Sequence, residues 1–150
     1  MPESIYPKIY LYRQIVRATL FIDENYASRI ALDQVANAAF FSKFHFIRLF
    51  KKIYGQTPHQ YLTTLRIEKS MQLLRSGLSV TEACYEVGFE SPGSFSSLFR
   101  RTTGLTPSAY LSHQQKIRAR ISKSPLDFIP GCFAEKKGWK QKSNFEEPAY

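Results

Sequence analysis

The sequence predicts an all-α protein in which a long linker helix joins two helix-turn-helix subdomains, about seven helices in all, followed by an irregular C-terminal tail. One segment occurs twice: residues 48–62 (RLFKKIYGQTPHQYL) return as residues 97–111 (SLFRRTTGLTPSAYL), with the shared residues 49 positions apart. Apolar residues recur at helical spacing through most of the chain up to about residue 120. Glycines and Thr-Pro or Ser-Pro pairs separate the helical segments, as is typical of helix ends and helix starts.

We expect the first helix-turn-helix over about residues 9–56. Helices are predicted over about Tyr10–Tyr26 and Leu32–Ala38, and a third helix follows the N-cap Ser42 and ends at Gly55. In this third helix, apolar residues at i, i+3, i+4 and i+7 predict one buried face, made of Phe46, Leu49, Phe50 and Ile53.

The linker helix is expected over about residues 57–76, with Thr57 as its cap, Pro58 in its first turn and Gly77 as its stop. The 19 residues from Pro58 onward would span about 28 Å at 1.5 Å per residue. Successive major grooves on one face of DNA lie about 34 Å apart. A stiff helix of this length would hold two DNA-binding units near that separation within one monomer.

The second helix-turn-helix is expected over about residues 77–120. Ser79 and Glu82 have the spacing of a capping box at the start of a short helix, and Gly88 supplies the tight turn that follows it. Two more helices follow, from Ser91-Pro92 to Gly104, burying Phe95, Leu98 and Phe99, and from Thr106-Pro107 to about Arg120.

Residues 121–150 show no helical period and predict a mostly irregular tail of unknown role. Four aromatic residues in it would anchor parts of the tail on the core: Phe128, Phe133, Trp139 and Phe145.

The net charge of +9 on 150 residues favours a phosphate-rich partner, either nucleic acid or an anionic membrane surface. No apolar run approaches the roughly 18 residues of a membrane span, and the first residues lack the pattern of a secretory signal, so we expect a cytoplasmic protein with no membrane association. Cys84 and Cys132 belong to no CxxC pair or Cys/His cluster, so neither a metal nor a cofactor is expected.

The helix between Ser42 and Gly55 has an exposed face that predicts base recognition. Large apolar residues stand there beside cations, which suits a DNA major groove, where arginine pairs with guanine and apolar groups touch thymine methyls. The face comprises Lys43, Phe44, Ile47, Arg48 and Lys51, while Ser42, Lys51 and Lys52 would reach phosphates. In the alternative interpretation, Phe44 and Ile47 pack on a neighbouring helix or on the tail.

The equivalent helix of the second unit exposes shorter side chains, which would discriminate less between bases. This face comprises Pro92, Gly93, Ser94, Ser96 and Ser97, with Arg100 and Arg101 as clamps on the DNA backbone.

The sequence segments around these helices resemble those of a known protein family. From about Ile9 to Leu111 the chain resembles the DNA-binding domain of the AraC/XylS transcription regulators, on the marks FSKFHFIRLFKKIYGQTPHQYL, RIEKSMQLLRSG and VTEACYEVGFESPGSFSSLFRRTTGLTPSAY. The resemblance implies two helix-turn-helix units that bind adjacent major-groove segments. It places Phe44, Ile47 and Arg48 at base-facing positions of the first unit, and Pro92, Gly93, Ser94, Ser96 and Ser97 in the second. The chain departs from the family pattern at Ser70, Ser97 and Leu111, where the family often has Ala, Arg and Arg.

We expect no effector-binding domain beside this one, and the sequence is similar to the short, stand-alone activators of that family. We expect a bacterial, sequence-specific regulator of transcription that binds double-stranded DNA as a monomer, contacts RNA polymerase, associates with the nucleoid when bound, and is not an enzyme. Two alternatives remain: a DNA-targeted enzyme or redox sensor that uses Cys132, and a protein-interaction module that has lost DNA binding.

Overall fold

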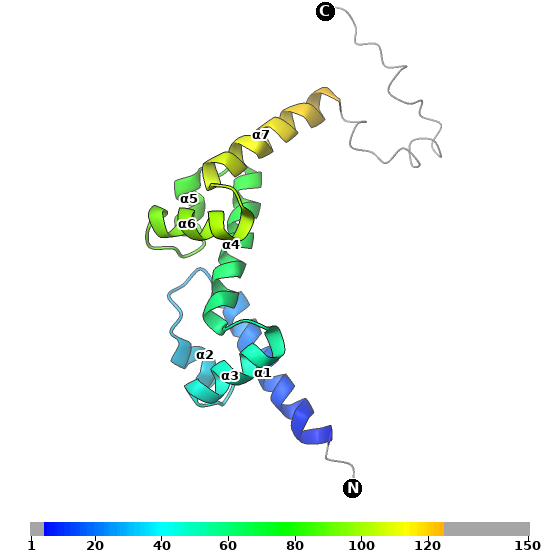
Figure 1. The fold of residues 1–150 in the computed structure, drawn as a ribbon, viewed down its shortest axis with the longest axis vertical. Coiled ribbons are helices and arrows are strands. Elements are labelled where there is room, and N and C mark those ends of the chain that lie inside the picture. Colours follow the sequence, from blue (N-terminus) through cyan, green and yellow to red (C-terminus); the bar gives the residue numbers. More distant parts are fainter. Residues whose placement is uncertain (1–4, 125–150) are drawn as a thin grey trace, which may run out of the picture. The chain divides into compact units, whose positions relative to one another are not determined.

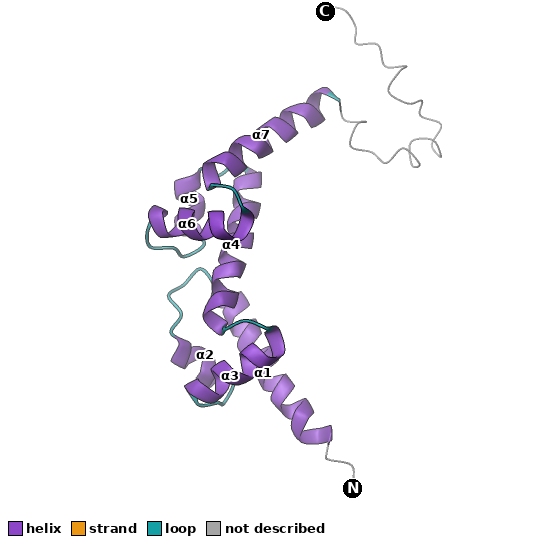
Figure 2. Cartoon of the chain, viewed as in Figure 1, coloured by secondary structure: helices purple, strands orange, loops and turns teal. Residues whose placement is uncertain are grey.

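The computed structural model describes residues 5–124, with side chains from residue 9 onward, and this part of the chain is helical without strands (Figures 1 and 2). The prediction of an all-α fold is confirmed. The helices are α1 (Ile5–Asn25), α2 (Leu32–Ala38), α3 (Lys43–Tyr54), α4 (Pro58–Ser76), α5 (Val80–Glu86), α6 (Pro92–Thr103) and α7 (Pro107–Lys123). The chain divides into two compact parts. The first extends to Pro107 and contains α1–α6, and the second contains the rest of α7.

Two helix ends differ from the prediction. Helix α1 begins at Ile5 instead of near Tyr10, because Pro7 falls in its first turn, where a missing N–H costs no hydrogen bond. Helix α7 continues past Arg120 to Lys123, and Pro125 explains its end, since a proline disfavours helical backbone in the residue before it. The predicted tail anchors and Cys132 lie outside the described residues.

Local capping sets several helix starts. The Thr57 hydroxyl accepts a hydrogen bond from the Gln60 N–H (3.2 Å), while the Thr57 N–H donates to the Gln60 side chain (2.9 Å). Ser79 and Glu82 exchange the same pair of bonds at 3.2 and 2.8 Å, which confirms the predicted capping box and lowers the pKa of the Glu82 carboxyl. Ser42 has the backbone conformation of an N-cap, but its hydroxyl makes no capping hydrogen bond.

The core of the first helix-turn-helix lies between α1, α2, α3 and the start of α4. Its centre is formed by Phe46 and Phe50, which are both fully buried, and the Phe50 ring stacks on Tyr54 at 4.6 Å. Leu49 and Ile53, predicted to be buried with them, are only half-buried at the edge of this cluster. Helix α3 therefore contacts the core through a narrow buried strip with half-buried margins, and its opposite side is exposed.

Helix α4 contacts α1 and α3 as well as α5 and α6, and so supports both helix-turn-helix units (Figure 1). Leu62 belongs to the first core, and Ile67 and Leu74 are buried further along the helix. Ser70 is also fully buried, and its hydroxyl donates to the Ile67 carbonyl at 2.6 Å. The serine therefore satisfies its polar group within its own helix at a position where the family often has alanine.

The two helix-turn-helix units differ by one residue in the turn. Equivalent residues of α3 and α6 are 49 positions apart, whereas those of α2 and α5 are 48 apart, so the second turn is one residue longer. In the shorter first turn, Phe40 adopts the left-handed conformation with φ 58°, and Gly88 takes its place in the second turn with φ 91°. Phe40 thus does what a glycine does in the other copy, with its side chain 72% exposed.

Candidate nucleic-acid interface

Helix α3 presents the predicted recognition face. Because Phe46 and Phe50 point into the core, the residues on the opposite side of the helix face outward. Phe44 is 75% exposed, and Arg48, Lys51 and Lys52 are exposed along the same side. No described residue buries Phe44, so the alternative in which this ring packs on a neighbouring helix does not hold for the described part of the chain.

Ile47 departs from the prediction, because it is half-buried at the margin of the face. Its position lies between the buried strip of Phe46 and Phe50 and the exposed strip of Phe44 and Arg48. Only part of this side chain is therefore available to a groove, and Phe44 provides the largest exposed apolar surface on α3.

Helix α6 repeats this geometry with smaller side chains. Phe95 and Phe99 are fully buried, so the opposite side of the helix faces outward. Ser96 is half-buried, and the other predicted residues are exposed: Pro92, Gly93, Ser94, Ser97, Arg100 and Arg101. Gly93 and Ser97 occupy the positions that Phe44 and Arg48 hold on α3, so α6 has almost no side-chain bulk at the centre of its exposed face.

Hydrogen bonds at the start of α6 orient one of these serines. The Ser91 hydroxyl accepts from the Ser94 N–H at 3.3 Å and donates to the Ser94 hydroxyl at 3.0 Å. Ser94 can still donate its own hydroxyl proton to an acceptor outside the protein.

The charged residues on α3 and α6, the two predicted recognition helices, are all positive. Neither helix contains an aspartate or glutamate. Six of the residues predicted to contact DNA are cations on these two helices: Lys43, Arg48, Lys51, Lys52, Arg100 and Arg101. Lys43 is partly engaged within the protein, since its ammonium lies 3.7 Å from the carboxylate of Asp33 on α2. The pairs Lys51-Lys52 and Arg100-Arg101 lie in the last turns, where cations also stabilise the helix end.

Two exposed aromatic residues on or near α3 were not predicted as candidates. Phe40 lies in the turn before α3, and its left-handed conformation has no signature in the sequence. His45 is exposed on α3, where its ring meets Phe41 edge-on at 5.2 Å. The sequence could have indicated His45, because residues three positions apart are neighbours on a helix surface and His45 lies three residues before Arg48.

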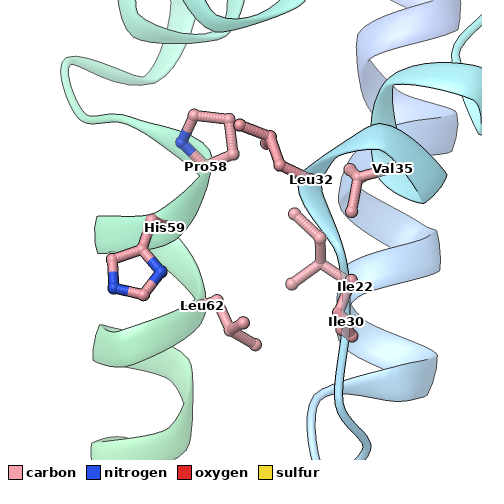
Figure 3. Close-up of a pocket in the computed structure, with 7 residues that line it drawn as sticks. All are labelled: Ile22, Ile30, Leu32, Val35, Pro58, His59 and Leu62. Carbon is pink, nitrogen blue, oxygen red and sulfur yellow. The ribbon is translucent and has the colours of Figure 1, made fainter. Parts of the chain in front are cut away.

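The described part of the chain contains no group of three or more His, Cys, Asp or Glu residues that could hold a metal. Cys84 is fully buried, and burial raises the pKa of its thiol, which keeps it protonated and unreactive. A pocket next to the first core has mainly apolar walls, and its sole polar lining side chain is His59 (Figure 3), so it lacks the converging polar groups of a typical small-molecule site. None of the described helices is long and apolar enough to cross a membrane.

Two helix-turn-helix units with basic exposed helices, both packed on one linker helix, define a helix-turn-helix DNA-binding domain. The family model described as "Helix-turn-helix domain" matches residues 35–113, which is more than half of the chain. The chain belongs to the AraC-type family of helix-turn-helix transcription regulators, whose members are not enzymes.

Three relatives illustrate the match. The MmsAB operon regulatory protein of Pseudomonas aeruginosa is 38% identical over 99 residues, covering 65% of this chain and 31% of that protein. The transcriptional activator AarP of Providencia stuartii is 32% identical over 92 residues, covering 61% and 68%. The Tn10 TetD protein of Escherichia coli is 36% identical over 92 residues, covering 61% and 67%. The chain thus spans about a third of the first of these relatives and about two thirds of the others.

Solved structures agree with the sequence match. An AraC-type regulator from Chromobacterium violaceum superposes with a TM-score of 0.65 at 26% identity, covering 69% of this chain and 93% of that chain. The DNA-binding domain of AdpA, solved in complex with a target DNA, superposes with a TM-score of 0.64 at 28% identity, covering 74% and 96%.

Proposed function

We propose that this protein binds double-stranded DNA sequence-specifically and activates transcription, with α3 and α6 entering adjacent major-groove segments. The observation that carries the proposal is the exposed face of α3, where Phe44 and Arg48 project between cations and opposite a buried strip. A protein-interaction surface would not need a second copy of this arrangement, with basic residues at the same two positions of α6. The AdpA domain, which was solved with its target DNA, has the same fold.

The residues divide into two roles. Arg48 would donate two hydrogen bonds to one guanine while Phe44 and the exposed part of Ile47 contact thymine methyls. On α6, Ser94, Ser96 and Ser97 would hydrogen-bond at short range, with Pro92 and Gly93 allowing close approach. The remaining residues would bind phosphates: Ser42, Lys43, Lys51, Lys52, Arg100 and Arg101.

The test is selection of preferred sites from a random duplex library, followed by binding curves at several salt concentrations. We expect an enriched sequence with two half-sites. Each neutralised phosphate should add roughly −0.9 to the slope of log affinity against log salt, so Lys52→Ala should make that slope shallower by about one phosphate. An affinity that does not change with salt would instead support a protein-interaction module.

One chain carries both recognition helices, so we propose that a single monomer occupies both half-sites, and sedimentation of the complex should give one protein per duplex. The names of AarP and of the lactose operon transcription activator of Staphylococcus xylosus support activation. We propose RNA polymerase as the protein partner and the nucleoid as the place of action. Transcription in vitro with purified bacterial RNA polymerase, from a template bearing the selected site, should rise when the protein is added.

A further inference from the structure

The guanidinium of Arg66, midway along α4, holds the end of α1. Its Nε donates to the Tyr26 carbonyl at 2.6 Å, and Nη2 donates to the Ser28 carbonyl at 2.8 Å. Tyr26 directly follows the last residue of α1, where helix carbonyls lack partners within the helix. The Lys69 ammonium lies 5.7 Å from the Tyr26 ring centroid, so two cations of α4 interact with the segment that follows α1.

The same guanidinium also contacts the second helix-turn-helix. It lies 5.8 Å from the ring centroid of Phe89, which is buried in the turn before α6 and packs against Phe95 at 5.2 Å. A Cβ atom at the neighbouring Gly88 would lie 2.6 Å from the Ala27 carbonyl oxygen and 3.1 Å from Arg66 Nη2. The loop 26–28, the middle of α4 and the turn 88–89 therefore meet at one point, which we call the junction.

The junction joins segments that lead directly into the two DNA-binding units. Loop 26–28 precedes α2 of the first unit, and turn 88–89 precedes α6 of the second. Arg29 and Glu90, the residues that directly follow these two segments, form an ion pair at 3.4 Å, but both side chains are largely exposed, so it contributes little. Arg66 is different, because its planar fork donates to two carbonyls while its guanidinium carbon lies over the Phe89 ring, a combination that lysine cannot reproduce.

We propose that Arg66 is a positioning residue that fixes the separation and rotational phase of α3 and α6, and thereby the spacing between half-sites that the protein accepts. This inference rests on the proposed DNA binding by both units. One base pair between the half-sites rotates the second half-site by about 34–36° and moves it along the duplex axis. With a rigid junction, α3 and α6 cannot both bind half-sites whose spacing has changed. Without the arginine fork, the second helix-turn-helix can rotate relative to the first and bind the displaced half-site.

The experiment uses the full chain and the duplex selected by the wild-type protein, with one base pair inserted or deleted between the half-sites, together with a duplex that keeps only the α3 half-site. The wild type is expected to lose about tenfold or more in affinity on each altered spacing, comparable to one mismatched base pair. For Arg66→Lys and Arg66→Met this loss should shrink to about threefold, with binding to the single half-site within about twofold of wild type. Arg13→Met, which removes an exposed arginine of α1, is the matched control and should keep the wild-type spacing preference.

Melting curves identify any variant that fails to fold, and Phe89→Leu then tests the junction from its other side with the same expected loss of spacing preference. An Arg66 variant that weakens all duplexes equally, including the single half-site, would overturn the proposal and leave Arg66 a purely structural role. A folded variant with an unchanged spacing penalty would overturn it too. A wild-type protein that selects only one half-site, or none, would instead refute the two-unit binding on which the inference rests.

Discussion

Gly88 approaches Ala27 so closely that a Cβ atom on Gly88 would lie 2.6 Å from the Ala27 carbonyl oxygen. Gly88→Ala must therefore displace the loop that follows α1, in addition to forcing alanine into a left-handed conformation. We expect it to cost about 2 kcal/mol or more in the free energy of unfolding, measured by urea denaturation. Gly77→Ala is the matched control, because Gly77 also has a positive φ but open space around it. Equal losses for the two variants would show that only backbone strain matters at Gly88.

Phe40 occupies in the first turn the position that Gly88 has in the second. Its left-handed conformation is strained, and no burial of the ring offsets this strain, because the side chain is exposed. Phe40→Gly should remove strain of about 1–2 kcal/mol and lose part of that gain to the greater freedom of the unfolded chain. The expected result is a small rise in the free energy of unfolding, up to about 1 kcal/mol. A clear loss of stability would mean that the exposed ring makes contacts that its exposure does not suggest.

The Tyr61 hydroxyl donates to the Asp23 carboxylate at 2.9 Å. Burial, followed by the bond to Asp23, raises the pKa of Tyr61 to about 12, above the ordinary value of about 10 that applies to the unfolded chain. The stabilisation from this group is therefore complete below pH 10 and is lost as the pH rises through 12. Tyr61→Phe should lower the free energy of unfolding by about 1–2 kcal/mol at pH 7, and by progressively less between about pH 10 and 12.

The control for this measurement is Tyr85→Phe, because Tyr85 is 54% exposed on α5 and should change stability by less than about 0.5 kcal/mol. The difference in the free energy of unfolding between the wild type and Tyr61→Phe should shrink above pH 10. A difference that stays constant from pH 8 to strongly alkaline conditions would show that folding does not raise the pKa of Tyr61.

The two recognition helices should contribute unequally to base discrimination. Arg48→Ala should lower affinity and relax the preference at one base position, because a bidentate pair contributes about 1–3 kcal/mol of discrimination. Ser97→Ala, at the equivalent position on α6, should cost little, and Arg100→Ala should weaken binding to all sequences alike. Binding curves on operators altered in either half-site measure these effects. Greater sensitivity to changes in the α6 half-site would reverse the assignment.

A chain that ends after Lys123, the last residue of α7, should fold and bind DNA like the full chain. The buried hydrophobic residues of the described part lie between Ile15 and Tyr110, so this truncation removes none of them. The melting temperature and the affinity for the selected duplex are the measurements. Loss of folding or of all binding would place part of residues 124–150 inside the DNA-binding domain.

The helices were predictable because their pattern depends on residues three or four positions apart, although the predicted cap Ser42 makes no capping hydrogen bond. The caps Thr57–Gln60 and Ser79–Glu82 follow directly from side-chain chemistry at that spacing. The exposed positions of Phe44 and Arg48 followed from the buried positions of Phe46 and Phe50 on the same helix. The predictions were less accurate at the margins, where Leu49, Ile53 and Ile47 are half-buried, since periodicity gives the direction of a side chain but not the width of the contact that covers it.

Local patterns in the chain were thus sufficient to predict the seven helices, the duplicated segment and the basic exposed faces of α3 and α6. The left-handed Phe40, the ion pair of Lys43 with Asp33 and the junction at Arg66 emerged only from tertiary packing. Arg66 binds carbonyls 38 and 40 residues away, and backbone carbonyls are the same in every residue, so the sequence carries no mark of which ones a side chain will reach. That choice is made by the packing of α1 and α6 on α4, which brings together groups that no helical period relates.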